Sequence, residues 1–181
     1  MIRLLSDEVL SDEVLNRALD MLAKQPQSSQ LVLFNTFWYE KIKEGKYSDA
    51  KAWLARSLNG RPAGGLRLIC VPINISNAHW VLVFADLERN TVQEWDPASV
   101  DSPLDPSRVN NVKDAVEKVL EFEKLKRRPL RVVPAPKRLP QQPDVINCGL
   151  FVVLFMIQIC FLRKPPSEEW KAAYEKEGGG G

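Results

Sequence analysis

Three cysteines and a single histidine are the residues of this 181-residue chain best suited to covalent chemistry on an amide. A thiol attacks an amide carbonyl when a base produces the thiolate and a donor binds the oxyanion. Cys148 follows a proline-rich loop and begins an apolar segment, which places its sulfur at a helix N-terminus. Free N–H groups and the helix dipole stabilise a thiolate there. Cys148 is therefore the candidate nucleophile, and Gly149 beside it lets a substrate backbone come close.

The other two cysteines, Cys70 and Cys160, lie within apolar segments and are expected to be structural. Taken alone, Cys148 also fits a structural cysteine that starts a core helix. The other members of a catalytic set must therefore support it.

His79 follows a polar turn and opens an apolar strand, while Asp96 ends the next strand 17 residues later. If the two strands form a hairpin, both residues lie at one edge of the sheet. A carboxylate beside the imidazole fixes its tautomer and stabilises the imidazolium. A lone histidine is more often a surface or satisfied residue, and Asp-Pro is a common strand-ending turn. The pairing of His79 with Asp96 is what makes them a candidate base and orienting acid.

Two glutamines, Gln141 and Gln142, precede Cys148 by seven and six residues in an irregular loop. A side-chain amide held against the nucleophile can donate a hydrogen bond to an oxyanion. The loop thus offers the remaining group that amide hydrolysis by a thiol requires.

The elements that must position these residues predict an α+β fold with helices packed on a small central mixed sheet. Periodicity and capping signals indicate the helices, and period-two runs indicate the strands. The predicted helices cover Ser11 to Lys24, Leu31 to Ile42, Asp49 to Leu58, Val109 to Leu125 and Cys148 to Leu162. The predicted strands cover Leu66 to Ile73, Trp80 to Leu87, Thr91 to Trp95 and Leu130 to Val133. We expect one domain over 1–165, followed by a polar, Gly-ended tail over 166–181.

The composition, 45% hydrophobic and 27% charged with a net charge of +2, is that of an ordinary globular protein. It gives no indication of nucleic-acid or membrane binding. The longest apolar run, Leu150 to Ile157, is too short to cross a bilayer. Three cysteines without metal-ligand spacing indicate free thiols in a reducing compartment, either nucleus or cytoplasm. We expect a monomer without metal or cofactor.

Several segments, in this order, resemble the ubiquitin-like-protein-specific cysteine proteases, the sentrin (SUMO) protease type. Leu10–Leu15 (LSDEVL) is similar to the opening Leu-Asn-Asp-Glu-Val-Ile helix of that family, and Phe34–Tyr39 (FNTFWY) to its Phe-Asn-Ser/Thr-Phe-Phe-Tyr segment. Val71–Asn74 with His79-Trp80 resembles its histidine hairpin. The most specific blocks are Pro140-Gln141-Gln142 and Cys148–Phe151 (CGLF). The resemblance covers residues 10 to 163.

The resemblance implies a papain-like-superfamily protease core, although the order His, Asp, Cys differs from papain, where cysteine comes first. It makes Cys148 the nucleophile, His79 the base, Asp96 its orienter and Gln142 the oxyanion donor, helped by the Cys148 N–H. Trp80 would lie over a narrow channel for the Gly-Gly tail of a ubiquitin-like modifier. The implied activity is hydrolysis after that Gly-Gly, with SUMO as the expected modifier. The implied substrate-binding residues are Trp80, Gly149, Val9 and Asp12.

Several positions depart from the family pattern, including Asp96, which precedes a proline. Val9 stands where a tryptophan usually forms the second channel wall, and Asn147 replaces an acidic residue before the cysteine. Two alternatives remain: an acyltransferase, which shares the His-Asp-Cys order, and a modifier-binding module without activity, which the absent channel tryptophan suggests. The acyltransferase would need a basic cofactor pocket, and Lys124 to Arg128 is the only dense basic run.

Overall fold

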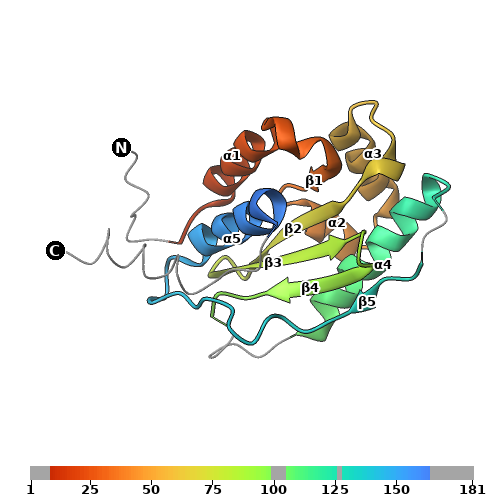
Figure 1. The fold of residues 1–181 in the computed structure, drawn as a ribbon. Coiled ribbons are helices and arrows are strands. Elements are labelled where there is room, and N and C mark those ends of the chain that lie inside the picture. The colour runs from red at the N-terminus through yellow and green to blue at the C-terminus, as the bar shows by residue number, and fades with distance from the viewer. Residues whose placement is uncertain (1–8, 99–104, 126–127, 164–181) are drawn as a thin grey trace.

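A five-stranded mixed sheet forms the centre of the computed structural model, which describes residues 9–98, 105–125 and 128–163 (Figure 1). The strands follow chain order across the sheet. The three central strands pair antiparallel, and each edge strand pairs parallel with its neighbour. They are β1 (Leu31–Leu33), β2 (Leu68–Ile75), β3 (His79–Asp86), β4 (Thr91–Trp95) and β5 (Arg131–Val132). The predicted α+β class with a small mixed sheet is confirmed.

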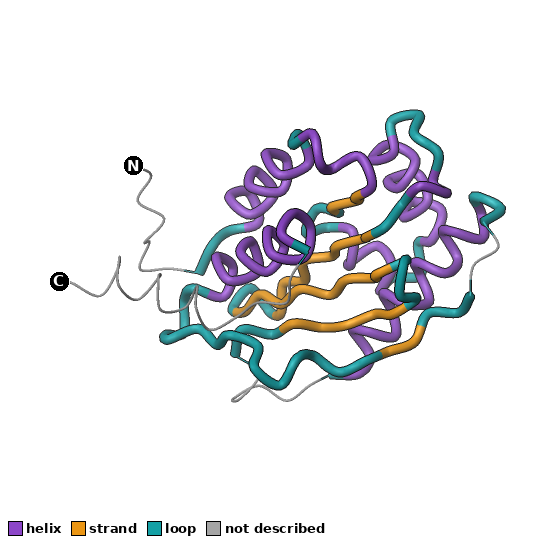
Figure 2. Tube along the Cα trace, viewed as in Figure 1, coloured by secondary structure: helices purple, strands orange, loops and turns teal. Residues whose placement is uncertain are grey.

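Helices cover both faces of the sheet (Figures 1 and 2). The helices are α1 (Asp12–Ala23), α2 (Trp38–Lys43), α3 (Tyr47–Leu58), α4 (Pro106–Phe122) and α5 (Cys148–Ile157). Short 3₁₀ segments span Pro26–Gln30 and Ala63–Gly65, and a π-helical turn spans Gln158–Leu162. Helices α1 and α5 lie on one face, while α2, α3 and α4 lie on the other. The nucleophile candidate therefore begins a helix that packs directly on the sheet.

Strand β3 is buried on both faces because its alternate side chains enter two separate cores. Val81, Val83 and Ala85 belong to the core beneath α2, α3 and α4. Trp80, Leu82 and Phe84 point into the core beneath α1 and α5. This double burial holds the strand that begins with His79 rigidly in the centre of the molecule.

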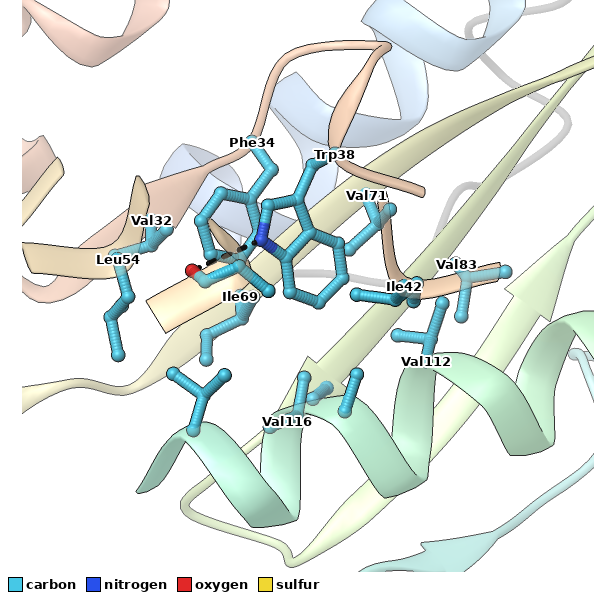
Figure 3. Close-up of a cluster of buried hydrophobic side chains, with 14 of the residues drawn as sticks. Val32, Phe34, Trp38, Ile42, Leu54, Ile69, Val71, Val83, Val112 and Val116 are labelled. Carbon is cyan, nitrogen blue, oxygen red and sulfur yellow. Dashed lines mark hydrogen bonds between the residues drawn. The ribbon is translucent and has the colours of Figure 1, made fainter. Parts of the chain in front are cut away.

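The core beneath α2, α3 and α4 is organised around Trp38, which has no exposed surface (Figure 3). The indole stacks on Phe34 with ring centroids 4.1 Å apart, and its N–H faces the carbonyl of Ala50 at 3.4 Å. Val112 and Val116 of α4 close this core from below the sheet. The stack ties the start of α2 to the sheet and to α3.

The prediction of one buried helix from Leu31 to Ile42 is wrong. Leu31–Leu33 instead forms strand β1, which pairs in parallel with β2, and helix α2 begins only at Trp38. Between them, the Asn35 side chain accepts from the N–H of Phe37, and the Asn16 side chain accepts from the N–H of Thr36. Pairing with a distant strand and these side-chain bonds supply the partners that a continuous helix would have provided.

The other predicted helix boundaries differ from the observed ones by a few residues. Ser11 caps α1 as predicted, since its side chain accepts from the N–H of Val14. Helix α4 begins at Pro106 rather than Val109, because Asp105 caps it and proline suits the first turn. The last helix ends at Ile157, and the π-helical turn continues to Leu162. The tail over 166–181 lies outside the described residues.

Candidate active site

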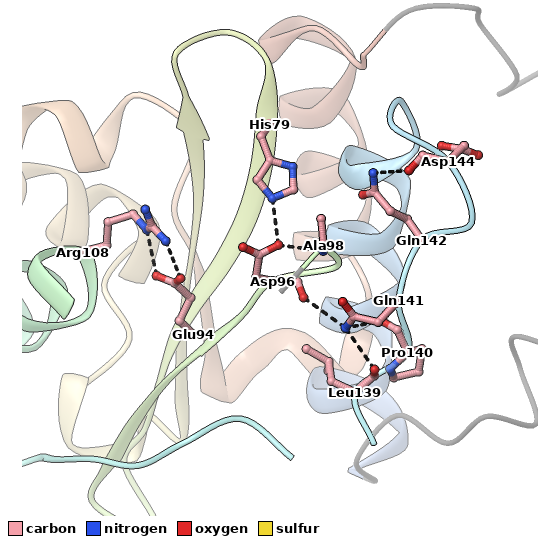
Figure 4. A network of polar contacts seen from close by, with 10 residues as sticks. All are labelled: His79, Glu94, Asp96, Ala98, Arg108, Leu139, Pro140, Gln141, Gln142 and Asp144. Carbon is pink, nitrogen blue, oxygen red and sulfur yellow. Dashed lines mark hydrogen bonds and ion pairs between the residues drawn. The ribbon is translucent and has the colours of Figure 1, made fainter. Parts of the chain in front are cut away.

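The β3–β4 hairpin places His79 and Asp96 at the same edge of the sheet, as predicted. His79 opens β3 and Asp96 directly follows β4, and the imidazole Nε2 lies 2.8 Å from Asp96 Oδ1 (Figure 4). Asp96 is 1% exposed, and its Oδ1 also accepts from the N–H of Ala98 at 2.7 Å. A buried carboxylate held by a backbone donor is well suited to orient an imidazole.

This environment favours the protonated form of His79. The hydrogen bond with Asp96 is the largest cause, followed by a hydrogen bond with Cys148, and together they raise the pKa of His79 to about 9 against an opposing effect of burial. Since Nε2 faces Asp96, Nδ1 is the ring nitrogen left for the thiol. The arrangement connects acid, imidazole and sulfur in sequence, with the imidazolium favoured near neutral pH.

Cys148 is the first residue of α5 and is buried, with Asn147 at the N-cap position. The N–H of Phe151 donates to the carbonyl of Asn147 at 3.0 Å, so the helical hydrogen bonds begin at the residue directly before Cys148. The sulfur therefore lies at the positive end of a helix dipole, which stabilises a thiolate. The other two thiols face each other, with Cys70 Sγ and Cys160 Sγ 3.8 Å apart on the same sheet face but inside the core.

The two glutamines of the loop point in different directions (Figure 4). The Gln141 amide donates to the carbonyls of Leu139 and Asp96, at 3.1 and 3.4 Å. The Gln142 amide donates to the carbonyl of Asp144, and its backbone N–H donates to the carbonyl of Pro97 at 2.8 Å. Both amides thus donate to backbone carbonyls, and both residues line the cavity beside His79. The role of Gln142 as oxyanion donor stays a prediction.

A cavity of about 230 Å³ opens at His79. Its lining comes from the turn after β4 and from the loop before Cys148: Pro97, Ala98, Gln141, Gln142, Asp144 and Val145. Val145 is 82% exposed at this cavity. The cavity is therefore accessible to a substrate on the side of the imidazole.

The predicted substrate-binding residues lie in two places. Trp80 has no exposed surface, and its indole N–H donates to the carbonyl of Leu10 at 2.7 Å. A Cβ added at Gly149 would lie 2.9 Å from the Cβ of Leu10. Val9 packs against the same core. In this conformation the Val9-Leu10 segment covers both Trp80 and Gly149, and their contact with a substrate stays a prediction.

Asp12 lies apart from these three residues. It lines a second hollow with polar residues of the β2–β3 turn and with Phe37, which is 51% exposed. This hollow offers an apolar ring and a carboxylate on a surface next to the hairpin that carries His79. Binding of a modifier by Asp12 also stays a prediction.

Sequence reasoning missed Asp144, whose side chain accepts from the N–H groups of Ile146 and Asn147 at 2.9 Å. An aspartate that binds its own backbone two residues later is a common turn former. Asp144 directly after Pro143 was the signal that could have found it. It also missed Arg108, which pairs with Glu94 two residues before Asp96.

Comparison with known proteins agrees with this geometry. A model of the Ulp1 protease family, C-terminal catalytic domain, matches residues 8–173. The chain belongs to the Ulp1 protease family. Sentrin-specific protease 2 of Pongo abelii is 26% identical over 153 residues, covering 78% of this chain and 24% of that protein. Ubiquitin-like-specific protease 1 of Saccharomyces cerevisiae is 25% identical over 150 residues, covering 80% of this chain and 22% of that protein.

Solved structures show the same Ulp1 fold. A SUMO protease Ulp1 with its catalytic cysteine oxidised to a sulfinic acid superposes with a TM-score of 0.74 at 21% identity, covering 92% of this chain and 73% of that one. The Ulp1 domain in complex with Smt3, the yeast ortholog of SUMO, gives 0.67 at 22% identity, covering 83% and 65%. The present chain spans about a quarter of the length of the curated Ulp1-family relatives it matches.

No cluster of three His, Cys, Asp or Glu side chains suited to a metal ion occurs in the part of the chain that the structure describes. Within the same residues, no helix is both long and apolar enough to cross a membrane.

Proposed function

We propose that this chain is a cysteine peptidase that hydrolyses the bond after the C-terminal Gly-Gly of a ubiquitin-like modifier, with SUMO as the modifier. The observation that carries the proposal is the 2.8 Å pairing of His79 with the buried Asp96 in a Ulp1-family fold. Cys148 begins helix α5, and its thiol is one of the groups that raise the pKa of His79. Relatives named as SUMO or sentrin proteases support the choice of modifier.

The proposed reaction begins with the Cys148 thiolate, whose proton has moved to His79. The sulfur attacks the carbonyl carbon of the terminal glycine, and the amide of Gln142 and the Cys148 N–H bind the oxyanion. His79 then gives its proton to the leaving amine, which departs and leaves a thioester on Cys148. A water molecule, deprotonated by His79, attacks the thioester and releases the modifier with a free carboxylate.

Asp96 acts in this scheme through His79 alone. Its buried carboxylate holds Nε2 and stabilises the imidazolium that forms in each half of the reaction. The free thiols of the chain suit a reducing compartment, so we place the enzyme in the nucleus or the cytoplasm. Its proposed partners are the modifier and its conjugates, and it is proposed to act as a monomer.

Modifier probes with a C-terminal vinyl sulfone test this proposal. Incubation with SUMO, ubiquitin and a third ubiquitin-like probe should give one covalent adduct, with the SUMO probe, located on Cys148 by mass spectrometry. Cys148→Ser should bind SUMO but form no adduct and cleave nothing, whereas Cys70→Ser and Cys160→Ser should keep activity.

Each other outcome selects a different function. An adduct with ubiquitin alone would mean that the modifier is wrong. Binding of SUMO without an adduct would identify a non-catalytic module. Acetylation of protein substrates from acetyl-coenzyme A, without cleavage of any modifier, would identify the acyltransferase.

A further inference from the structure

Asp144 ties together the loop that carries both Gln142 and Cys148. Its Oδ1 accepts from the N–H groups of Ile146 and Asn147, and its Oδ2 accepts from the side-chain amide of Asn147. Its own carbonyl accepts from the side-chain amide of Gln142 (Figure 4). One residue thus contacts the candidate oxyanion donor on one side and the residue before the nucleophile on the other.

We propose that Asp144 is a positioning residue, which holds Gln142 and the start of α5 in the relative orientation that the thiol reaction needs. This inference rests on the proposed function. Asn147 is the N-cap residue of α5, and its carbonyl accepts from the N–H of Phe151. Fixing Asn147 therefore fixes the direction in which Cys148 leaves the loop, while fixing Gln142 sets where its amide points.

The charge of Asp144 is part of this role. Burial raises the pKa of Asp144, but the hydrogen bonds from Ile146 and Asn147 together lower it by more than burial raises it. The net pKa therefore lies below the ordinary value. The group is a carboxylate at neutral pH, which accepts three N–H bonds without donating one. A carboxylate accepts more strongly than a neutral amide, and this suits a turn that must not open during the reaction.

The contact between Asp144 and Asn147 joins an acceptor-only group to an amide donor. Asp144→Asn would put two amides opposite each other, and one of them must turn. Asn147→Asp would put two carboxylates opposite each other, and they repel. Exchanging both residues restores one carboxylate and one amide. The double exchange should therefore recover activity if the two side chains are paired by charge and hydrogen bonding, and it should not if Asp144 only fills space.

The experiment compares Asp144→Asn, Asn147→Asp and the double exchange by kcat, KM and melting temperature on a SUMO-extended substrate. We expect Asp144→Asn to lower kcat by roughly 10–100-fold with KM nearly unchanged, since small misplacements of reacting groups have effects of this size. Asn147→Asp should lower it further, and the double exchange should recover most of the loss. In a Gln142→Ala background, Asp144→Asn should have a smaller effect, because part of its role is then gone.

A matched control is Asp105→Asn, because Asp105 accepts from the N–H of Ser107 in a similar turn at the start of α4. It should alter stability without changing kcat. Unchanged kcat in Asp144→Asn, or equal losses with and without Gln142, would overturn the proposal. So would a double exchange no better than the single variants.

Alkylation of Cys148 by iodoacetamide across pH separates this inference from the proposed function, because it needs no modifier. Slower alkylation in Asp144→Asn and recovery in the double exchange support the positioning role even if no modifier is cleaved. Identical pH profiles in all three variants contradict it, whatever the substrate proves to be.

Discussion

The guanidinium of Arg108 on α4 binds the carboxylate of Glu94 on β4 through two hydrogen bonds, with Nε–Oε2 and Nη2–Oε1 distances of 2.9 and 2.6 Å (Figure 4). Both residues are buried, with side-chain exposures of 10% for Arg108 and 3% for Glu94. Glu94 stands two residues before Asp96, so the pair anchors to α4 the strand end from which the candidate acid projects. The bidentate geometry gives this anchor a fixed direction.

Removing one partner of this pair should be costly. Arg108→Leu leaves the Glu94 carboxylate buried without compensation, and we expect the free energy of unfolding to fall by about 3–5 kcal/mol. Replacing both with leucine should return it close to the original value. Urea unfolding measures both variants, and a loss for Arg108→Leu of about 0–1 kcal/mol, as for a surface pair, would contradict this account.

Asp96→Asn should keep the fold but lower kcat by several orders of magnitude, on the order of 10⁴-fold, because the imidazole loses its orienting charge. The same change should alter the pH dependence. His79 has a pKa of about 9, so kcat/KM of the unmodified enzyme should fall as pH rises through about 9, where the imidazolium is lost. In Asp96→Asn this alkaline limb should move to lower pH.

The stability of the folded protein should also depend on the protonation of His79. The raised pKa of His79 means that its contribution to stability is fully present below its ordinary value of 6.5 and is lost as pH rises through about 9. Between pH 6.5 and 9.5, the melting temperature should therefore fall more in the unmodified protein than in Asp96→Asn. A rate loss below about tenfold, with parallel melting curves, would reduce Asp96 to a turn residue.

Gln142→Ala should lower kcat by roughly 10²–10³-fold with KM nearly unchanged, because an oxyanion donor binds charge that exists only in the transition state. Gln141→Ala is the control. Its amide contacts backbone carbonyls, including that of Asp96, so its loss should affect stability more than kcat. If steady-state kinetics show Gln141→Ala to be the more damaging change, the two glutamines have been assigned the wrong way round.

Trp80 combines a buried indole with a predicted place over the glycine channel. Trp80→Ala should lower the free energy of unfolding by about 3–5 kcal/mol, as loss of a large buried side chain does. If Trp80 also restricts the channel, the rate ratio for Gly-Gly over Gly-Ala tails should fall, because the clash with a methyl group is gone. Melting temperature and this ratio are measured on one preparation. Lower stability with an unchanged ratio would show that Trp80 is a core residue only.

Gly149→Ala tests the close approach of the Val9-Leu10 segment. The added methyl would lie 2.9 Å from the Leu10 Cβ, closer than carbon atoms pack, so either that segment or α5 must shift. We expect lower stability, by about 1–3 kcal/mol as for overpacking, and slower probe labelling of Cys148. Leu10→Ala keeps its own Cβ, whereas Leu10→Gly removes it. Only Leu10→Gly should therefore rescue Gly149→Ala fully, and equal rescue by both would place the clash elsewhere.

The sequence by itself determined the parts of the site that depend on local pattern. A polar turn before an apolar strand indicated the position of His79, and a hairpin of two neighbouring strands then predicted Asp96 at the same edge of the sheet. A proline-rich loop followed by an apolar run indicated that Cys148 starts a helix. In each case neighbouring residues in the chain decide the structure, because turns, alternation and helix starts are short-range features.

Only the tertiary structure decided the rest. The segment from Leu31 to Leu33 is apolar enough for a helix, but pairing with β2, whose strand begins 35 residues further on, makes it a strand. Trp80 is buried in the core beneath α1 and α5, and its indole N–H finds its acceptor in the carbonyl of Leu10, 70 residues away in sequence. The direction of the Gln142 amide depends on the turn that Asp144 forms. Such contacts join groups whose pairing leaves no periodic signal in the chain, since each is selected by packing and by the need to satisfy buried polar groups.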